Sequence, residues 1–502
     1  TDFYVIKDFK KEKNQEIQFD LNSKLKKDNL SFEIKLGELL QGNLRILQED
    51  VTGVFVINPK LGIKDNLSEK LGKLKITGTL NELDFGTVFD GEENTSIKIP
   101  SNIDIDNLQI KKTTLGSLDL DEVSIDLINQ DEYIFINLNG QKIKGDVYLS
   151  KHLSSGLILS LDYLIFSSSG EFGDFNWESF PKSLNFPLIF YSKEIVINNE
   201  YYGPWSFDIS LSKEAISFED ISGSYGGFRV GDRISFPEFY PDLNPFIEDR
   251  SFKTKKINQS IEQGGWSIPA RTNLEFFRNK RDNSSRFSGM ISTNNLSDSL
   301  GLEYSDYKVQ AGDFFLLLDV KWEGSPDKID LDELRGKAEF RLKDLFIPRE
   351  SEDMSEIDIL RLIRVFNIAD IFGNLTDLFS RRFEKGFSSD RVEAFINLSP
   401  NKLETTKPMT FKSSSGEFKW DGYVLRDASG KFTEIDFNVV MTLPLRDYLP
   451  AYALILGGPL SAVGVYIAGR TFKRPLNKLS SGKWRVWGDL DEIKAEFVEW
   501  FE

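Results

Sequence analysis

The sequence contains no cysteine and only one histidine, His152, among its 502 residues. The absence of cysteine excludes disulfide frameworks, thiolate nucleophiles and cysteine-based metal sites. A lone histidine at the end of an expected strand is most simply a surface or edge residue, and it leaves little basis for a Ser-His triad or a histidine metal site. The sequence therefore predicts no catalytic residue, no metal site and no cofactor.

Acidic residues outnumber basic residues. There are 62 Lys and Arg against 79 Asp and Glu, which gives a formal net charge of −17. A surface that binds nucleic acid needs a basic footprint, so nucleic acid is disfavoured as a partner. The mean hydropathy of −0.31 fits a folded, water-soluble body, not a polytopic membrane protein. The length exceeds what one core usually organises and predicts several domains or an extended repeating architecture.

Convincing helical periods are scarce before residue 348, and a period of two takes their place. In "NIDIDNLQI", for example, Ile103 and Ile105 alternate with Asp104 and Asp106. Such alternation is typical of antiparallel strands with one apolar and one wet face. Residues 115–149, 203–230 and 332–347 repeat this strand-and-turn pattern loosely. The 41 phenylalanines are expected to fill the apolar face.

Three local features refine the strand prediction. The alternation changes parity near Glu122, as a bulge or tight turn requires. Asn139-Gly140 lies between apolar runs and predicts a hairpin turn, because both residues accept positive φ. The glycine-rich stretch "GSYGGFRVG" (223–231) lacks the spacing of a phosphate-binding loop and predicts turns between strands.

The pattern changes after residue 348. Residues 349–383 have helical spacing, and residues 384–448 return to strand patterns that continue the β-groove of residues 1–348. Residues 449–480 predict an apolar broken helix or a helical hairpin, and residues 481–502 predict a C-terminal β-strand region. The predicted fold is therefore mainly β. It is an elongated, curled antiparallel sheet that forms a repeating groove over 1–348, with a few helices near the C-terminus.

Leu449–Gly469 contains no charge over 21 residues. A membrane span, a helical hairpin packed on the sheet end and a membrane-touching tip are the three interpretations. Pro459 at the centre would break a helix, and both flanks have strand patterns, so we favour a broken apolar helix at the mouth of a groove. The candidate membrane or lipid contacts are Leu449, Tyr452, Leu454, Ile455, Leu456, Val463, Val465 and Ile467. The candidate head-group contacts are Arg470, Lys473 and Arg474.

A long sheet with one apolar face must cover that face with another sheet, with helices or with a ligand. Acyl chains suit this role, because exposing the roughly 30 methylenes of a two-chain lipid to water costs about 0.8 kcal/mol each. A lipid conduit needs an apolar lining and no catalytic residue. The alternative is a structural or interaction protein of the cell envelope with a closed β core. An enzyme is disfavoured, because no cluster of chemical groups stands out from the alternating polar face.

Several segments between residues 264 and 491 resemble the C-terminal region of the YhdP proteins, AsmA-like members of the bridge-like lipid-transport group. They include "GWSIPARTNLEF", "KWEGSPDKIDLDELRGKAEFRLKD", "ILRLIRVFNIADIF", "FEKGFSSDRVEAFINLS", "TLPLRDYLPAYALILGGPLSAVGVYIAG" and "KWRVWGDLDE". The most specific element consists of Trp322, Gly324, Ser325 and Pro326. One departure is Leu345, where the family usually has glycine, and it predicts a different turn.

The resemblance implies a β-groove in the periplasm of a Gram-negative bacterium. It implies an inner-membrane anchor upstream of Thr1, in a part of the protein missing from this sequence, and contact of the C-terminal end with the outer membrane. The implied role is non-enzymatic movement of phospholipid between the two membranes, which supports the outer-membrane permeability barrier. Phospholipid acyl chains would be the partner inside the groove.

Overall fold

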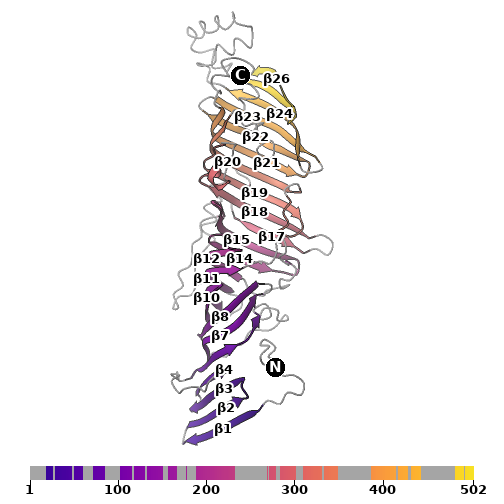
Figure 1. Cartoon of the computed structure of the whole chain (residues 1–502). Helices are drawn as coiled ribbons and strands as arrows, with labels where there is room; N and C mark the ends of the chain where they lie inside the picture. The colour runs from indigo at the N-terminus through magenta and orange to yellow at the C-terminus, as the bar shows by residue number, and fades with distance from the viewer. Residues whose placement is uncertain are drawn as a thin grey trace, which may run out of the picture. The chain divides into compact units, whose positions relative to one another are not determined.

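Figure 1 shows a computed structural model of the chain. It describes residues 18–26, 29–47, 50–59, 72–84, 102–115, 118–130, 133–150, 156–166, 177, 188–231, 268, 271–278, 283–300, 309–330, 333–348, 386–413, 416–427, 431–442, 481–490 and 492–501. The chain divides into two compact units. Unit 1 is Thr1–Tyr225 with Arg233–Glu248, and unit 2 is Gly226–Asp232 with Asp249–Glu502.

The described residues are nearly all β-strand, which confirms the predicted fold class. The one α-helix among them is the short α3 (Leu296–Ser299). The predicted helical regions, 349–383 and 449–480, lie outside the described residues. No helix in the described part of the chain is long and apolar enough to span a membrane.

Unit 1 holds fifteen strands in one sheet. They are β1 (Phe19–Lys26), β2 (Asn29–Leu36), β3 (Leu40–Leu47), β4 (Asp50–Ile57), β5 (Leu74–Leu80), β6 (Leu83–Asp84), β7 (Ile103–Leu115), β8 (Leu118–Asn129), β9 (Tyr133–Gly140), β10 (Ile143–Ser150), β11 (Leu157–Phe166), β12 (Leu188–Ile197), β13 (Glu200–Tyr201), β14 (Trp205–Leu211) and β15 (Ala215–Tyr225). Most neighbours are antiparallel. The pairs β4–β5, β5–β7, β6–β7 and β11–β12 are parallel, which the sequence pattern did not predict.

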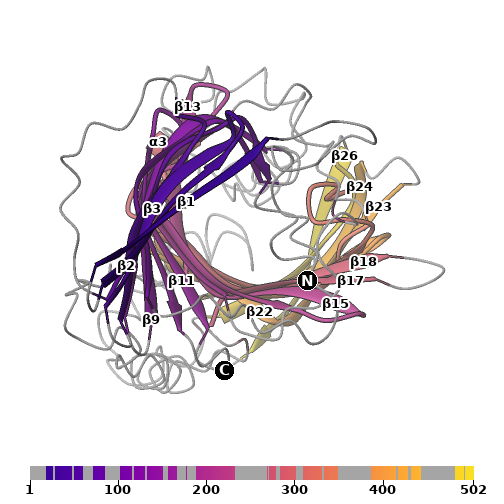
Figure 2. The same ribbon diagram turned by 90° about the horizontal axis from the view of Figure 1, so that it is seen from below.

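Unit 2 holds eleven strands, and all of their pairings within the unit are antiparallel. They are β16 (Phe228–Val230), β17 (Asn273–Phe277), β18 (Ser284–Thr293), β19 (Phe314–Glu323), β20 (Arg335–Pro348), β21 (Gly386–Ser399), β22 (Lys402–Ser413), β23 (Gly416–Arg426), β24 (Phe432–Thr442), β25 (Ser481–Asp489) and β26 (Glu492–Phe501). From β18 to β26 each strand pairs with the next one along the chain. Seen from below, the strands of each unit bend into an arc (Figure 2).

The predicted change of parity near Glu122 is confirmed. Leu120 and Val123 are both buried although they are three residues apart. Asp121, between them, has a φ of 55°, and the pairing of β7 with β8 shifts register at this point. A bulge therefore turns both side chains to the apolar face.

The predicted hairpin of β9 and β10 is present, but its turn was misplaced. Asn139 lies inside β9 and pairs with Lys144, so Gln141 and Lys142 form the turn. Neither Asn139 nor Gly140 has positive φ. Gly140 is needed for a different reason, because a Cβ atom there would lie 2.8 Å from the carbonyl oxygen of Glu122 on the adjacent strand.

The different turn predicted at Leu345 was wrong. Leu345 lies within β20, pairs with Ser389 and is only 6% exposed. The positive φ, 52°, falls on Asp344, which the pairing of β20 with β21 skips. Asp344 interrupts the ladder without shifting the register, and aspartate tolerates this conformation, so no turn forms here.

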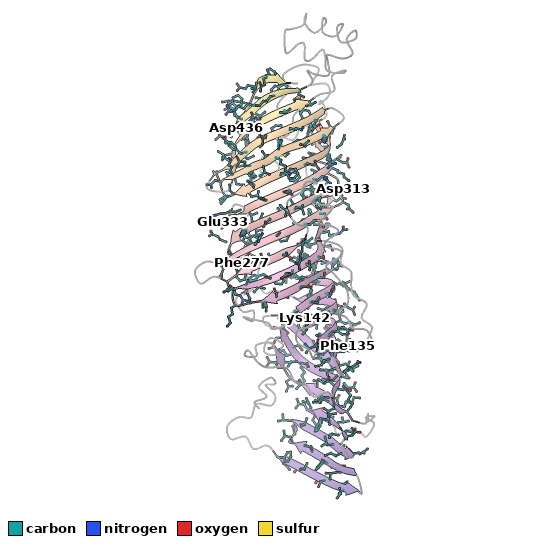
Figure 3. The ribbon with its side chains drawn as sticks, turned by 180° about the vertical axis from the view of Figure 1, so that it is seen from behind. Phe135, Lys142, Phe277, Asp313, Glu333 and Asp436 are labelled. Carbon is teal, nitrogen blue, oxygen red and sulfur yellow. The ribbon has the colours of Figure 1, made fainter. Side chains whose placement is uncertain are left out.

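Side chains stand on both sides of each sheet (Figure 3). In unit 2 the wet side carries ion pairs between strands, such as Arg286 with Asp319 at 2.9 Å and Arg485 with Asp436 at 2.8 Å. Leu317 is an exception on this side. It is fully buried and forms a small apolar cluster with Ile268, which explains why β19 is apolar on both faces.

Candidate functional site

The apolar face of unit 1 carries a row of paired residues that crosses thirteen strands. In pairing order the row is Phe19, Leu36, Leu40, Ile57, Gly78, Leu108, Ile125, Leu138, Gly145, Leu161, Ser192, Trp205 and Gly223. Ser192 is its one polar side chain, and its hydroxyl donates to the backbone carbonyl of Glu194 at 2.7 Å. At about 4.8 Å between strands, such a row extends for about 58 Å.

A second row runs beside the first and contains no polar residue. It consists of Phe55, Ile76, Ile105, Leu127, Ile136, Val147, Leu159, Phe190 and Phe207. Seven of the nine side chains are only half-buried, and Leu127 and Phe190 are buried. Apolar surface thus remains accessible on seven of the nine strands that the row crosses.

Unit 2 has an equivalent row across ten strands. It consists of Leu274, Phe287, Val320, Gly336, Leu398, Leu403, Val424, Ile435, Gly488 and Ile493. Every member is aliphatic, aromatic or glycine. The row extends for about 43 Å at the usual spacing of about 4.8 Å between strands, which exceeds the roughly 15 Å depth of one leaflet's hydrocarbon.

The glycines in these rows are required by the backbone. Gly145 has a φ of 150°, and a Cβ atom there would lie 2.3 Å from the carbonyl oxygen of Ser160 on β11. Gly336 has a φ of 149°, and a Cβ atom would lie 2.0 Å from the carbonyl oxygen of Asp319. Glycine therefore lets neighbouring strands pair through a conformation that other residues rarely adopt, and it adds no polar group to the row.

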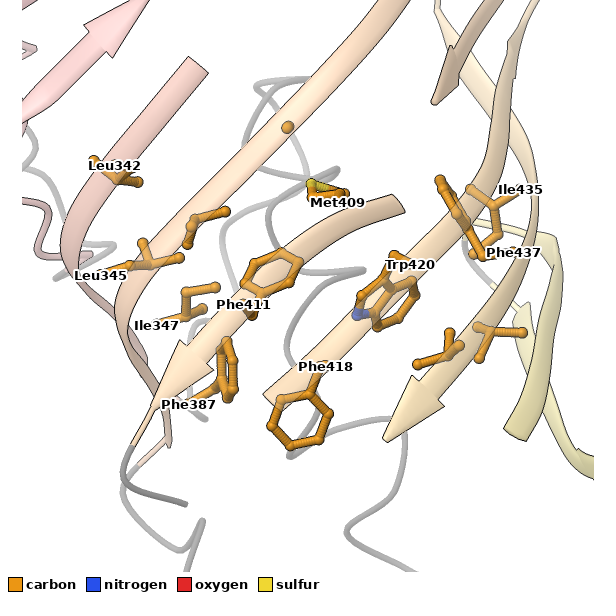
Figure 4. Packing of buried hydrophobic residues seen from close by; sticks show 14 of the residues in the cluster. Leu342, Leu345, Ile347, Phe387, Met409, Phe411, Phe418, Trp420, Ile435 and Phe437 are labelled. Carbon is orange, nitrogen blue, oxygen red and sulfur yellow. The ribbon is translucent and has the colours of Figure 1, made fainter. Parts of the chain in front are cut away.

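Unit 2 also has an apolar cavity of about 200 Å³ next to its row. It is lined by Phe340, Leu342, Leu345, Ile347, Val392, Ile396, Leu403, Glu404, Thr405, Met409, Phe411, Val424 and Phe437. Figure 4 shows several of these side chains, among them Leu342 and Phe437, on the concave side of the sheet. Eleven of its thirteen lining residues are apolar, so this cavity suits a hydrocarbon.

An irregularity in β22 creates space at this point. Glu404 pairs with Tyr423 and Met409 pairs with Trp420, so four residues of β22 lie opposite two of β23. The inserted stretch contains Pro408, which has no backbone N–H to contribute to the ladder. Thr405, at the start of the stretch, is held by its hydroxyl, which accepts from Gly422 N at 2.9 Å. This hydrogen bond joins the start of the inserted stretch to β23 beside the cavity.

The apolar face of unit 2 includes fully buried aromatic side chains near the cavity. Phe418 and Trp420 are both 0% exposed, and Phe387 packs against Phe418 edge-on with ring centroids 5.9 Å apart. Such close aromatic packing is typical of a protein core. Unit 2 thus combines a packed centre with a cavity, whereas unit 1 presents a half-buried apolar row.

Glu393, Arg391 and Arg341 form a charged cluster on the opposite face. Burial raises the pKa of Glu393, but hydrogen bonds from Arg391 and Arg341 outweigh it and hold its pKa below the usual value. These groups stabilise the sheet and do not line the cavity. Within the described residues, no group of three His, Cys, Asp or Glu side chains is arranged to hold a metal ion.

The site residues predicted from the sequence are not among these. The predicted lipid and head-group contacts, from Leu449 to Arg474, lie outside the described residues, and so does His152. The rows were missed as specific residues, although the period-two pattern marked their strands. The missing information was the register, which decides which alternating residues become neighbours.

A family model for the YhdP protein matches residues 6–494, nearly the whole chain. The chain belongs to the YhdP family. No curated protein and no solved structure matches it significantly. YhdP proteins are proteins of the Gram-negative cell envelope, and the long one-faced sheets agree with a bridge-like lipid-transport family.

The most specific YhdP element of the sequence has a structural role in unit 2. Trp322 is buried at the end of β19, and its indole N–H donates to the carbonyl oxygen of Ser325 at 3.1 Å. Gly324, between them, has a φ of 90°. The tryptophan thus closes the turn after β19 and extends the apolar face to the end of the strand.

Proposed function

We propose that this YhdP protein carries phospholipids between the inner and outer membranes of a Gram-negative bacterium, with their acyl chains on the apolar faces of its sheets. The main support is the second row of unit 1, which is apolar over nine strands and mostly half-buried. A lipid that crosses water must keep its methylenes covered, each worth about 0.8 kcal/mol. A continuous row covers them at every step along the sheet.

The proposal assigns no reaction to the protein. The acyl chains would lie along the rows while the charged head group stays in water, because burying an unpaired charge costs far more than burying a methylene. This arrangement needs no cofactor or metal. The implied location is the periplasm, with an upstream anchor in the inner membrane, and the movement would support the permeability barrier of the outer membrane.

Leu449–Gly469 and the basic residues after it would form the contact with the outer membrane. An apolar helix broken at Pro459 can lie in the interface with Arg470, Lys473 and Arg474 near anionic head groups. This part of the proposal rests on the sequence alone.

The test compares two neighbouring residues of β9 that face opposite sides of the sheet. Ile136 is in the second row, whereas Asn137 is on the opposite face, where its amide donates to Asp146 at 2.8 Å. We expect chains with Ile136→Asp to lose co-purified phospholipid, because a carboxylate in the row would be desolvated by the acyl chains. Chains with Asn137→Asp should keep it.

Lipid is measured by solvent extraction and mass spectrometry of gently purified full chains. Circular dichroism checks that both variants remain folded. If the parent chain carries no phospholipid, the transport proposal fails and the closed structural core becomes the better account. The complete burial of Phe418 and Trp420 is the observation that favours that alternative.

A further inference from the structure

A tryptophan outside the sheet contacts the apolar face of unit 1. Trp177 lies in the sequence between β11 and β12, two strands that pair in parallel. Its ring meets that of Phe218 on β15 edge-on, with centroids 6.0 Å apart and planes at 85°. The contact places this indole on one particular side of the sheet.

Aromatic contacts and strand pairing identify that side. Phe218 contacts Phe207 with ring centroids 5.5 Å apart, and Phe207 stacks on Phe190 at 4.6 Å. Phe190 and Phe207 are the last two members of the second row. Phe218 pairs with Ile209, which lies two residues from Phe207 and points to the same side. Trp177 therefore lies over the apolar face at the β14–β15 end of the row.

We infer that Trp177 forms the wall of the lipid path opposite the sheet and narrows it at β14 and β15. The inference rests on the proposed function, since it assigns a role in acyl-chain passage. An acyl chain that follows the second row past Phe207 meets the contact between Trp177 and Phe218. It must displace that contact to continue, so this residue sets the rate at which lipid passes.

Two properties suit Trp177 to this role. An edge-on aromatic pair is a modest interaction, so it yields to an arriving acyl chain. The indole also offers a large apolar surface to methylene groups once it has moved aside. Phe218 is half-buried, so its ring is available to the same acyl chain.

The absence of cysteine makes a site-specific probe straightforward, because one introduced cysteine is then the only thiol. Full chains with Trp177→Cys, Ile136→Cys or Asn137→Cys are labelled with bimane and mixed with vesicles of phosphatidylethanolamine and phosphatidylglycerol that contain a doxyl-acyl phospholipid. Ile136 is the reference in the row, and Asn137 is the control on the opposite face. We expect the doxyl group to quench bimane at positions 177 and 136 but not at 137.

The outcomes separate this inference from the proposed function. Quenching at 136 without quenching at 177 overturns the inference and leaves the lipid path intact. The absence of quenching at both positions overturns the lipid path itself.

A second measurement tests whether Trp177 limits the rate of lipid uptake. The uptake of a pyrene-labelled phosphatidylcholine from the same vesicles is followed for the parent chain, Trp177→Ala and Trp177→Phe. Because one aromatic pair is removed, Trp177→Ala should accelerate uptake by about two- to tenfold, whereas Trp177→Phe should stay close to the parent. An unchanged rate in Trp177→Ala contradicts a narrowing at this residue, even if position 177 contacts lipid.

Discussion

Single residues pair opposite charges on the polar faces of the sheets. In unit 2, Glu393 on β21 accepts a hydrogen bond from Arg341 Nε on the adjacent β20 at 3.0 Å. Arg391, two residues away on the same strand, also donates to it. The two donors favour the ionised carboxylate, so ion pairs on the polar face join β20 to β21 electrostatically.

This cluster predicts a pH-dependent contribution to stability. The pKa of Glu393 is lowered in the folded state, so its stabilising contribution is present above the unfolded pKa and is lost as the pH falls through the folded value. Glu393→Gln should therefore lower the melting temperature at pH 7 but leave it nearly unchanged at strongly acidic pH. The same substitution at the exposed Glu434 serves as the control. An equal loss at both pH values would show that the ion pairs are not the cause.

The strands were predicted from the sequence, but several of their turns and pairings were not. Alternation identified the β fold, and the parity change near Glu122 located a bulge, because both depend on neighbouring residues alone. The turn after Gly140 and the interruption of the ladder at Asp344 were misread, because each depends on the paired strand. The parallel pairs β4–β5 and β11–β12 were missed for the same reason, since strand direction is decided by the partner.

The cavity beside the irregular strand β22 can be tested by filling it. Leu403→Trp should fill part of the cavity of about 200 Å³ and reduce the amount of phospholipid that unit 2 retains. Fluorescence of a bound pyrene-acyl phospholipid, measured with the full chain, reports the change. Asn397→Trp, on the exposed face of β21, adds the same side chain outside the cavity and should have no effect. Equal lipid binding by both variants would remove the cavity from the account.

At the scale of the whole molecule, both units carry an apolar row on one face, and neither row contains a charged residue. The family match extends over both units, from residue 6 to 494. A structural scaffold needs only packed contacts, whereas a lipid carrier needs an apolar lining that continues from strand to strand. The continuous apolar rows therefore favour the carrier.

The predicted membrane contact depends on three basic residues after Gly469. Replacing Arg470, Lys473 and Arg474 with Glu should weaken binding of the chain to phosphatidylglycerol vesicles, since each basic residue near an anionic surface contributes about 1 kcal/mol. Vesicle sedimentation measures the loss. The exposed lysines Lys321, Lys337 and Lys412 provide a control with the same change in net charge. Equal losses in both variants would indicate a general charge effect without a specific contact.

Photo-crosslinking along the rows tests whether phospholipid lies on the apolar faces. Benzoylphenylalanine is placed, one position at a time, at Ile76, Ile136 and Leu159 in unit 1 and at Leu274 and Leu403 in unit 2. Control positions on the polar faces are Asn137, Lys337 and Lys419. After irradiation in cells, mass spectrometry of the full chain identifies phospholipid adducts. We predict adducts at every row position and none at the controls. Row positions without adducts, in a chain that remains folded, would contradict a lipid path.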